Sequence, residues 1–166
     1  PDKGFYEFIY SREVLIRHYP EIAEEFKYRV IAPTSQIKKI GQLQLNHLRK
    51  KGIIFCPYRS DASFYYLKSY ILVHPTQYGE GLSMVVLETS YLGIKVITTR
   101  NRGTEEILNS DYKYFLNDNS SVEIANLIAK TFSDKEYFEN LKIILRKRID
   151  KFFDKESSIN KFLKII

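Results

Sequence analysis

Residues 71–107 constrain the fold of this chain more than any other segment. A short apolar run at 71–74 ends at Pro75, an amphipathic stretch follows after a turn, and Gly93 ends that stretch before a second apolar run at 95–99. A strand, a loop, a helix and a strand in this order are typical of a parallel sheet, because parallel strands need a long crossover connection. The segment therefore predicts an α/β fold.

The same alternation of apolar runs and amphipathic stretches continues along the whole chain. It predicts strands at 28–32, 53–56, 70–74, 95–99 and 112–116. It predicts helices at 5–16, 37–48, 64–67, 82–92, 103–108 and 122–132, and a last helical region at 134–166. Since there is no repeat and no evident linker, we expect one Rossmann-like domain over residues 1–166, a parallel sheet with helices on both faces.

Size and composition fit a single globular domain. The 166 residues are 44% hydrophobic and 28% charged, and no apolar run approaches the length of a membrane span. The single cysteine, Cys56, excludes an internal disulfide and a cysteine-based zinc cluster. The three histidines show no metal-ligand spacing, so we expect no bound metal. We expect a cytoplasmic protein without a secretory leader.

The net charge of +6 is concentrated near the C-terminus. Residues 142–164 hold eight Lys and Arg against three acidic residues. Two interpretations stay open: a solvated helix face, or a surface for anionic lipid at the inner face of the membrane or for another part of the protein. The thirteen Tyr and eleven Phe are spread through core-like positions, so we do not expect a nucleic-acid partner.

The start of the predicted helix at 82–92 is the candidate binding site. Gly81, Leu82 and Ser83 open this helix, and the free N–H groups of a helix start can bind an anion such as a diphosphate. Gly81 lets the backbone approach such an anion closely. Ser83 could donate its hydroxyl to a phosphate or only cap the helix. Glu80, just before them, could bind a ligand or only complement the helix dipole.

A second carboxylate, Glu88, follows Glu80 at a spacing of eight residues. That spacing is about two helical turns, which places both carboxylates on nearly the same face. Because residues 85–87 are apolar, we expect Glu88 to be partly buried and to need a partner, either a ribose diol or a nearby Arg or Lys. Two carboxylates that frame an anion site suit a ligand with hydroxyls at both ends and phosphate between them, such as a nucleotide sugar.

Several of these motifs resemble one enzyme family. The Glu80-x7-Glu88 spacing, the preceding His-Pro-Thr at 74–76 and the Gly-Thr-Glu-Glu at 103–106 are similar to motifs of the retaining GT-B glycosyltransferases, in the large family that contains sucrose synthase and many bacterial mannosyltransferases. The Asp-Lys-Gly at 2–4 resembles the Lys-Gly element that follows the first strand of their C-terminal domain. The resemblance implies the donor-binding half of a GT-B enzyme.

The resemblance also implies a reaction. The enzyme would transfer a hexose from a nucleotide-diphosphate sugar to a glycan or lipid-linked acceptor, in polysaccharide biosynthesis, with no cofactor and no metal. Glu80 and Lys3 would be the catalytic residues: Glu80 beside the donor sugar, and Lys3 on the diphosphate, where a cation stabilises the departing nucleotide. Glu88 would bind the ribose, and residues 81–83 the diphosphate.

Two further donor-binding residues follow from the same resemblance. Tyr58 stands where family members hold the nucleobase and could pack on its face, although a loop tyrosine is often only a packing residue. Arg102 could contact phosphate or form a surface salt bridge. The chain departs from the family at Ser83, where a second glycine is usual, and at Lys95, where proline is common.

The family pattern also places a strand just before the Lys-Gly element. We therefore expect this chain to be part of a longer protein, whose N-terminal domain would supply the acceptor site. The isolated domain should bind nucleotide weakly and transfer nothing. Two alternatives share the fold: a nucleotide-sugar 2-epimerase, and an inactive nucleotide-sugar-binding module.

Overall fold

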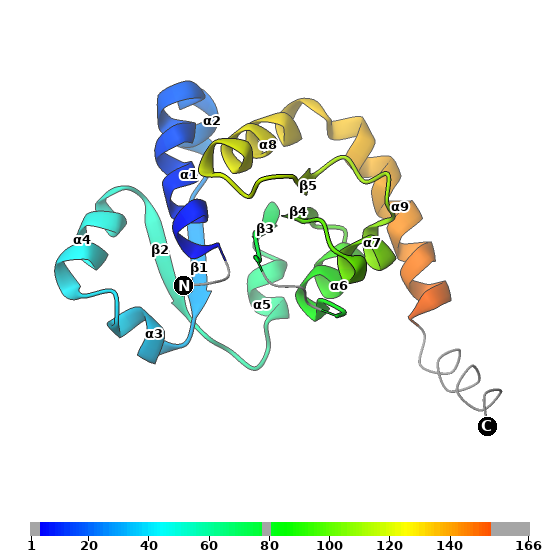
Figure 1. Ribbon diagram of the computed structural model, residues 1–166, viewed down its shortest axis with the longest axis horizontal. Helices are drawn as coiled ribbons and strands as arrows, with labels where there is room; N and C mark the ends of the chain where they lie inside the picture. Colours follow the sequence, from blue (N-terminus) through cyan, green and yellow to red (C-terminus); the bar gives the residue numbers. More distant parts are fainter. Residues whose placement is uncertain (1–3, 78–80, 154–166) are drawn as a thin grey trace.

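The computed structural model describes residues 4–77 and 81–153 (Figure 1). The strands lie between two layers of helices, with α1, α2 and α8 in one layer and α5, α6 and α7 in the other. In chain order the elements are α1 Phe5–His18, α2 Pro20–Glu25, β1 Tyr28–Ala32, α3 Thr34–Lys38, α4 Gln42–Lys50, β2 Ile53–Pro57, α5 Ser63–Tyr66, β3 Ile71–His74, α6 Met84–Tyr91, β4 Lys95–Thr99, α7 Arg102–Leu108, β5 Phe115–Leu116, α8 Ser121–Ser133 and α9 Lys135–Phe152.

The strands form two parallel sheets. β1 pairs with β2, with Tyr28 opposite Ile53 and Ala32 opposite Pro57. β3 pairs with β4, which also pairs with β5, so β4 is the central strand of its sheet. The predicted α/β class with parallel strands is confirmed. The expectation of one continuous sheet is not met among the described residues, because no hydrogen-bonded pairing joins β1 to β3.

Two predicted elements differ clearly from those observed, beyond small shifts at the ends of other elements. The single helix expected at 37–48 is divided into α3 and α4 at Gly41, whose φ of 82° lies in the left-handed region that glycine tolerates. The strand expected at 112–116 is reduced to β5. Tyr112 instead packs in the core and donates a hydrogen bond from its hydroxyl to the carbonyl of Val96, so an interior contact replaces strand pairing.

Side-chain caps fix the starts of two helices. At α8, the Ser120 hydroxyl accepts a hydrogen bond from the Glu123 N–H at 3.0 Å. At α7, the Asn101 side chain accepts from the Thr104 N–H, and the Thr104 hydroxyl accepts from the Asn101 N–H, each at 3.0 Å. Such reciprocal bonds satisfy N–H groups that a helix start would otherwise leave without partners. The chain therefore enters both helices at fixed positions.

The core joins segments that are distant in sequence. α1 packs against α8, and the α1 residues Ile9 and Leu15 are buried (Figure 1). The Tyr19 hydroxyl, just after α1, donates to Asn126 Oδ1 on α8 at 3.0 Å. The first helix of the chain is thus held by one of the last.

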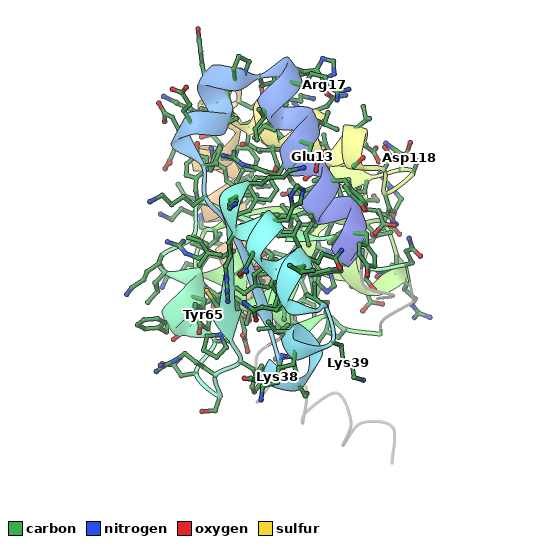
Figure 2. The ribbon with its side chains drawn as sticks, turned by 90° about the vertical axis from the view of Figure 1, so that its left-hand side faces the viewer. Glu13, Arg17, Lys38, Lys39, Tyr65 and Asp118 are labelled. Atoms are coloured by element: carbon green, nitrogen blue, oxygen red, sulfur yellow. The ribbon has the colours of Figure 1, made fainter. Side chains whose placement is uncertain are left out.

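The outer side of α1 carries charged residues that hold it to neighbouring loops. Figure 2 shows Glu13 and Arg17 along this side of the helix. Glu13 pairs with Lys51, which precedes β2. The Arg12 guanidinium donates to the Ala23 carbonyl at 2.6 Å and lies 5.5 Å from the centre of the Tyr28 ring. These contacts link α1 to the sheet that β1 and β2 form.

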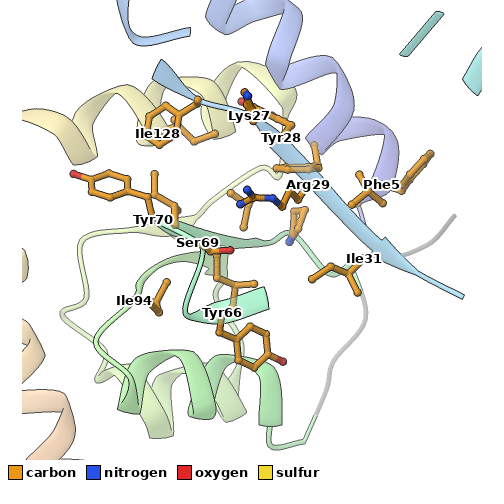
Figure 3. Close-up of a pocket in the computed structure, with 18 of the residues that line it drawn as sticks. Phe5, Lys27, Tyr28, Arg29, Ile31, Tyr66, Ser69, Tyr70, Ile94 and Ile128 are labelled. Atoms are coloured by element: carbon orange, nitrogen blue, oxygen red, sulfur yellow. The ribbon is translucent and has the colours of Figure 1, made fainter. Parts of the chain in front are cut away.

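A cavity of about 1760 Å³ separates the two sheets (Figure 3). All of β1 and residues 71–73 of β3 line it along its length, and we call it the inter-sheet cavity. Helices cover it on both sides. The lining residues from these helices include Phe5, Phe8, Ile128 and Phe132 on one side, and Tyr66 and Thr89 on the other.

Within residues 4–77 and 81–153, no helix combines the length and the apolar character that crossing a bilayer requires. Two basic residues of α9 contact other parts of this chain. Arg148 donates to the Glu106 carbonyl at 2.9 Å, and the Arg146 guanidinium lies 5.0 Å from the centre of the Tyr91 ring. Lys142 and Lys147 are exposed.

Candidate functional site

The carboxyl ends of the strands form the candidate site. α1 lies over one face of the sheets, while α5 and α6 lie over the other (Figure 1). On the two sides of the inter-sheet cavity, the connecting helices therefore lie in opposite layers. A position in a parallel sheet where the connections change from one layer to the other is called a topological switch point. In open α/β sheets, ligands bind in the crevice beyond the carboxyl ends of the strands at such a point.

The start of α1 lies directly against the end of β3. Gly4, which precedes α1, has a φ of 67°, and a Cβ atom placed on it would lie 2.1 Å from the carbonyl oxygen of Pro75. Only glycine fits both the conformation and the contact. A second contact follows, because Gln77 Nε2 donates to Glu7 Oε1 at 3.4 Å. The segment around Gly4 and the β3–α6 connection therefore meet, as the predicted site requires.

The β3–α6 connection leads into an open helix start. α6 begins at Met84, two residues after the predicted start, with Ser83 at the N-cap position. The Ser83 side chain is buried but forms no capping hydrogen bond, so the capping role that the sequence left open is not seen. Gly81 and Leu82 are exposed, and no atom lies within 4 Å of a Cβ placed on Gly81. This geometry leaves the first N–H groups of α6 accessible to an anion.

A second group of residues lies on the α5 side of this opening. The Tyr66 hydroxyl donates a hydrogen bond to the Glu88 carboxylate, which joins α5 to α6. Burial raises the pKa of Tyr66, and the charge of Glu88, the hydrogen bond to it and the neighbouring Tyr58 raise it further. Tyr58 is 67% exposed beyond the end of β2. The structure thus brings Tyr58 and Glu88, two predicted donor-binding residues, to the same tyrosine.

Tyr66 is the residue that sequence reasoning missed. It lies in a short aromatic run at 64–66 that reads as helix packing. Its side chain is buried, which agrees with that reading, but its hydroxyl points towards the start of α6 (Figure 3). The indication in the sequence was the tyrosine hydroxyl itself, because a buried tyrosine hydroxyl usually has a hydrogen-bond partner.

The expected burial of Glu88 is wrong. Glu88 is exposed, although residues 85–87 are apolar, because Val86 occupies the inner face of α6 and is 0% exposed. An exposed carboxylate does not need a buried cation. Among the ion pairs of the described residues, none includes Glu88, so the salt bridge considered as its alternative partner is not observed.

The loop after β4 carries the remaining predicted residue, Arg102. Arg102 opens α7, is 93% exposed in its side chain and pairs with Glu106 at 3.2 Å. Arg100 pairs with Glu105 at 2.7 Å and lies 4.5 Å from the centre of the Phe115 ring. The surface salt bridge that the sequence left open for Arg102 is therefore present, and its contact with phosphate stays a prediction.

The two predicted catalytic residues, Lys3 and Glu80, lie outside the described residues. The described part of the chain contains no group of three or more His, Cys, Asp and Glu side chains that could hold a metal ion.

The described residues provide three kinds of binding group. The start of α6 can bind an anion, the exposed carboxylate of Glu88 can accept hydrogen bonds from hydroxyls, and the exposed ring of Tyr58 can stack on a planar group. All three border the connections that leave the carboxyl ends of β2 and β3. Their chemistry fits a ligand made of a phosphate, a sugar and an aromatic ring.

Comparison with protein families gives a match over most of the chain. Residues 13–148 match the family described as glycosyl transferases group 1. A comparison with curated proteins gave no significant match. The C-terminal domain of the group 1 protein LpcC from Francisella tularensis superposes with a TM-score of 0.69 at 23% identity, over 93% of this chain and 81% of that domain.

Two larger structures match the whole chain. HepE from Anabaena, solved with UDP-glucose, gives a TM-score of 0.77 at 18% identity, over 100% of this chain and 46% of that one. A glycosyltransferase from Rickettsia africae gives 0.80 at 17% identity, over 99% of this chain and 44% of that one. The chain thus spans just under half the length of these proteins. The predicted fold, the C-terminal half of the GT-B architecture, is confirmed.

Proposed function

The chain belongs to the glycosyl transferases group 1 family, and we propose that it is the donor-binding part of a retaining hexosyltransferase that uses a nucleotide-diphosphate sugar. The observation that carries this proposal is the segment from Pro75 to Glu88, which contacts the start of α1 at Pro75, contains the open start of α6 and ends with Glu88 beside Tyr66. The structure of HepE with UDP-glucose supports a uridine nucleotide as the first donor to test.

Each part of the donor has a proposed partner. The diphosphate would accept hydrogen bonds from the N–H groups at Ser83 and the start of α6. The ribose diol would donate to Glu88, whose carboxylate is oriented by the hydroxyl of Tyr66. The nucleobase would pack against Tyr58, whose exposed ring lies near Tyr66.

The chemical step is proposed from the family resemblance. The bond between the anomeric carbon and the diphosphate oxygen breaks, the acceptor hydroxyl attacks from the same face, and its proton passes to the departing diphosphate. Glu80 would balance positive charge at the anomeric carbon, and Lys3 would neutralise the diphosphate. No metal is needed for this step. The acceptor, a glycan or a lipid-linked sugar, would be held by the N-terminal domain of a longer protein, and contact of α9 with an anionic membrane stays a prediction.

Calorimetry on the chain with UDP and UDP-glucose tests the proposal. We expect measurable binding that Glu88→Ala weakens by about tenfold or more, because a carboxylate that accepts hydrogen bonds from hydroxyls contributes about 1.5–3 kcal/mol. Glu106→Ala is the matched control, since Glu106 is an exposed helical glutamate that already has a partner on α7. Equal binding by the two variants would remove the ribose assignment.

Thermal unfolding in the presence of nucleotide sugars then identifies the donor. A ligand at one hundred times its Kd stabilises the folded state by about 2.7 kcal/mol, which for a chain of this size raises Tm by roughly 5–10 °C. UDP-glucose, GDP-mannose and free glucose form the panel, with glucose as the control that lacks a diphosphate. If no nucleotide sugar raised Tm, the donor-binding proposal would be wrong.

A further inference from the structure

The outer side of α9 carries apolar side chains that the described part of the chain does not cover. α9 forms one side of the molecule and packs on α6 and α7, with Leu145 and Ile149 buried (Figure 1). Ile143 and Ile144 lie away from this contact and are 60% and 59% exposed. The solvent side of a packed helix usually carries polar residues, so two adjacent branched apolar side chains there indicate a contact surface.

The apolar surface continues onto the end of α6. Tyr91 and Leu92 are 38% and 36% exposed. The Arg146 guanidinium lies 5.0 Å from the centre of the Tyr91 ring, and a Cβ atom placed on Gly93 would lie 2.5 Å from the Lys142 side chain. These contacts hold the end of α6 against α9 next to the two isoleucines, so apolar groups from two elements share one surface.

Charged residues on the same side of α9 are separated by sign. Glu136 and Glu139 precede the isoleucines, Lys147 and Lys151 follow them, and all four residues are exposed. Glu136, Ile143 and Lys147 are spaced by seven and four residues, so they lie on one line along the helix. Among the ion pairs of residues 4–77 and 81–153, none includes a residue of α9. We call this surface the α9 face, which consists of Glu136, Glu139, Ile143, Ile144, Lys147 and Lys151.

Two copies of the α9 face complement each other when the helices run antiparallel. In that arrangement Glu136 of each copy lies opposite Lys147 of the other, and the isoleucines meet between the two ion pairs. A parallel arrangement places like charges side by side. A surface that pairs with itself in this way has two-fold symmetry and closes on itself, so it gives a dimer and not a chain of copies.

From these observations we propose that the α9 face binds the same face of a second copy of this chain, with the two α9 helices antiparallel. α9 has 18 residues and is therefore about 27 Å long, which allows a contact of about five turns. Burial of the isoleucines stabilises the dimer, and the ion pairs determine the orientation of the two helices. This inference rests on α6 and α9 and does not depend on the proposed function.

An anionic membrane is the other partner considered for α9, and it fits this face less well. A helix that lies on anionic lipid carries Lys and Arg along its polar side. Glu136, Glu139 and Asp150 are exposed on the same side of α9 as the isoleucines, where anionic head groups would repel them. The separation of charges by sign therefore favours a second copy over a lipid surface.

Sedimentation equilibrium of the chain tests the proposal. Between about 10 μM and 1 mM protein we expect the mean mass to rise towards twice that of the chain. Ile143→Ser and Lys147→Glu should each raise the Kd of the dimer by at least about tenfold. Lys38→Glu is the matched control and should leave the Kd unchanged, because Lys38 is an exposed lysine on α3, at the other side of the molecule (Figures 1 and 2). All three positions are exposed, so the variants should fold like the wild type.

Charge reversal tests the orientation of the helices. Glu136→Lys makes the α9 face basic at both ends, and Lys147→Glu makes it acidic at both ends, so each variant alone should be mainly monomeric. The double variant restores an acid opposite a base and should dimerise like the wild type. A double variant that dimerises no better than the single variants would exclude the antiparallel arrangement.

Three further outcomes would overturn the proposal. The first is a wild-type chain that stays monomeric up to about 1 mM. The second is a dimer that Lys147→Glu weakens no more than Lys38→Glu. The third is binding of a monomeric chain to phosphatidylglycerol vesicles that Ile143→Ser abolishes, which would assign the α9 face to anionic lipid.

Discussion

β4 and β1 have similar apolar sequences but very different surroundings. Ile97 in β4 is 0% exposed, whereas Ile31 in β1 is 42% exposed. Among the residues that the structure describes, β4 has a strand on each side, while β1 has one strand partner and borders the inter-sheet cavity. A strand with one partner here leaves the residues of one face exposed, while Tyr28 and Val30 on the other face of β1 are buried.

The largest expected effect is the loss of the Ile97 side chain. Ile97→Ala should reduce the free energy of unfolding by about 2–5 kcal/mol, because it leaves a void in a packed interior. Ile31→Ala is the matched control on β1 and should cost less than about 1 kcal/mol. Urea denaturation of both variants measures the difference. Similar losses would show that β1 is as well packed as β4, and the comparison would fail.

A second prediction concerns the contact that links the two regions. Gly4→Ala should reduce the free energy of unfolding by about 2–4 kcal/mol, because a side chain at φ 67° is strained and also overlaps Pro75. Gly41→Ala shares the positive φ but has open space around it, so it should cost only about 1 kcal/mol. Thermal unfolding of both variants isolates the contribution of the Pro75 contact. Equal losses would mean that this contact contributes nothing.

Alkaline pH should destabilise the fold through Tyr28 of β1. Burial raises the pKa of Tyr28 from 10.0 to about 12, against smaller opposing effects of Ser11 and Arg12. The neutral side chain of Tyr28 therefore contributes about 3 kcal/mol to the free energy of unfolding below pH 10. This contribution is lost as the pH rises towards 12 and the hydroxyl ionises. Urea denaturation at pH 9 and pH 12 should show a smaller decrease for Tyr28→Phe than for the wild type. An equal decrease would assign the alkaline effect entirely to other groups.

The smallest effect is expected at the surface of α7. Arg102→Ala removes a solvent-exposed ion pair with Glu106 and should change the free energy of unfolding by only about 0.3–0.5 kcal/mol. The effect of Arg102→Ala on the affinity for UDP distinguishes a phosphate contact of this arginine from a surface ion pair. A large loss of affinity with unchanged stability would support the phosphate contact, and unchanged affinity would leave only the surface ion pair.

The sequence predicts the strands of this fold better than their assembly. β1 and β4 begin and end at the predicted residues, because runs of apolar and β-branched residues mark a strand locally. The division into two sheets could not be predicted, because pairing is a property of strands that are distant in sequence. The break at Gly41 was missed for a different reason: a glycine inside a helical pattern is often tolerated, and only its φ of 82° shows that the helix ends there.

The candidate site was predictable in position more than in detail. The start of α6 could be predicted because free N–H groups at a helix start can bind an anion, and Tyr58 was placed at the site by the family resemblance. The exposure of Glu88 was not predicted, because the apolar residues at 85–87 suggested burial without showing which of them faces inward. The link from Tyr66 to Glu88 joins two helices, and no local pattern encodes such a contact.

The packing of α1 against α8 has a consequence for synthesis of the chain on the ribosome. Tyr19 and Asn126, whose hydrogen bond links the end of α1 to α8, are separated by 107 residues. At 5–20 residues per second, the ribosome needs roughly 5–20 s to produce this interval. During that time the apolar face of α1, with Ile9 and Leu15, has no partner on α8 and is open to chaperones.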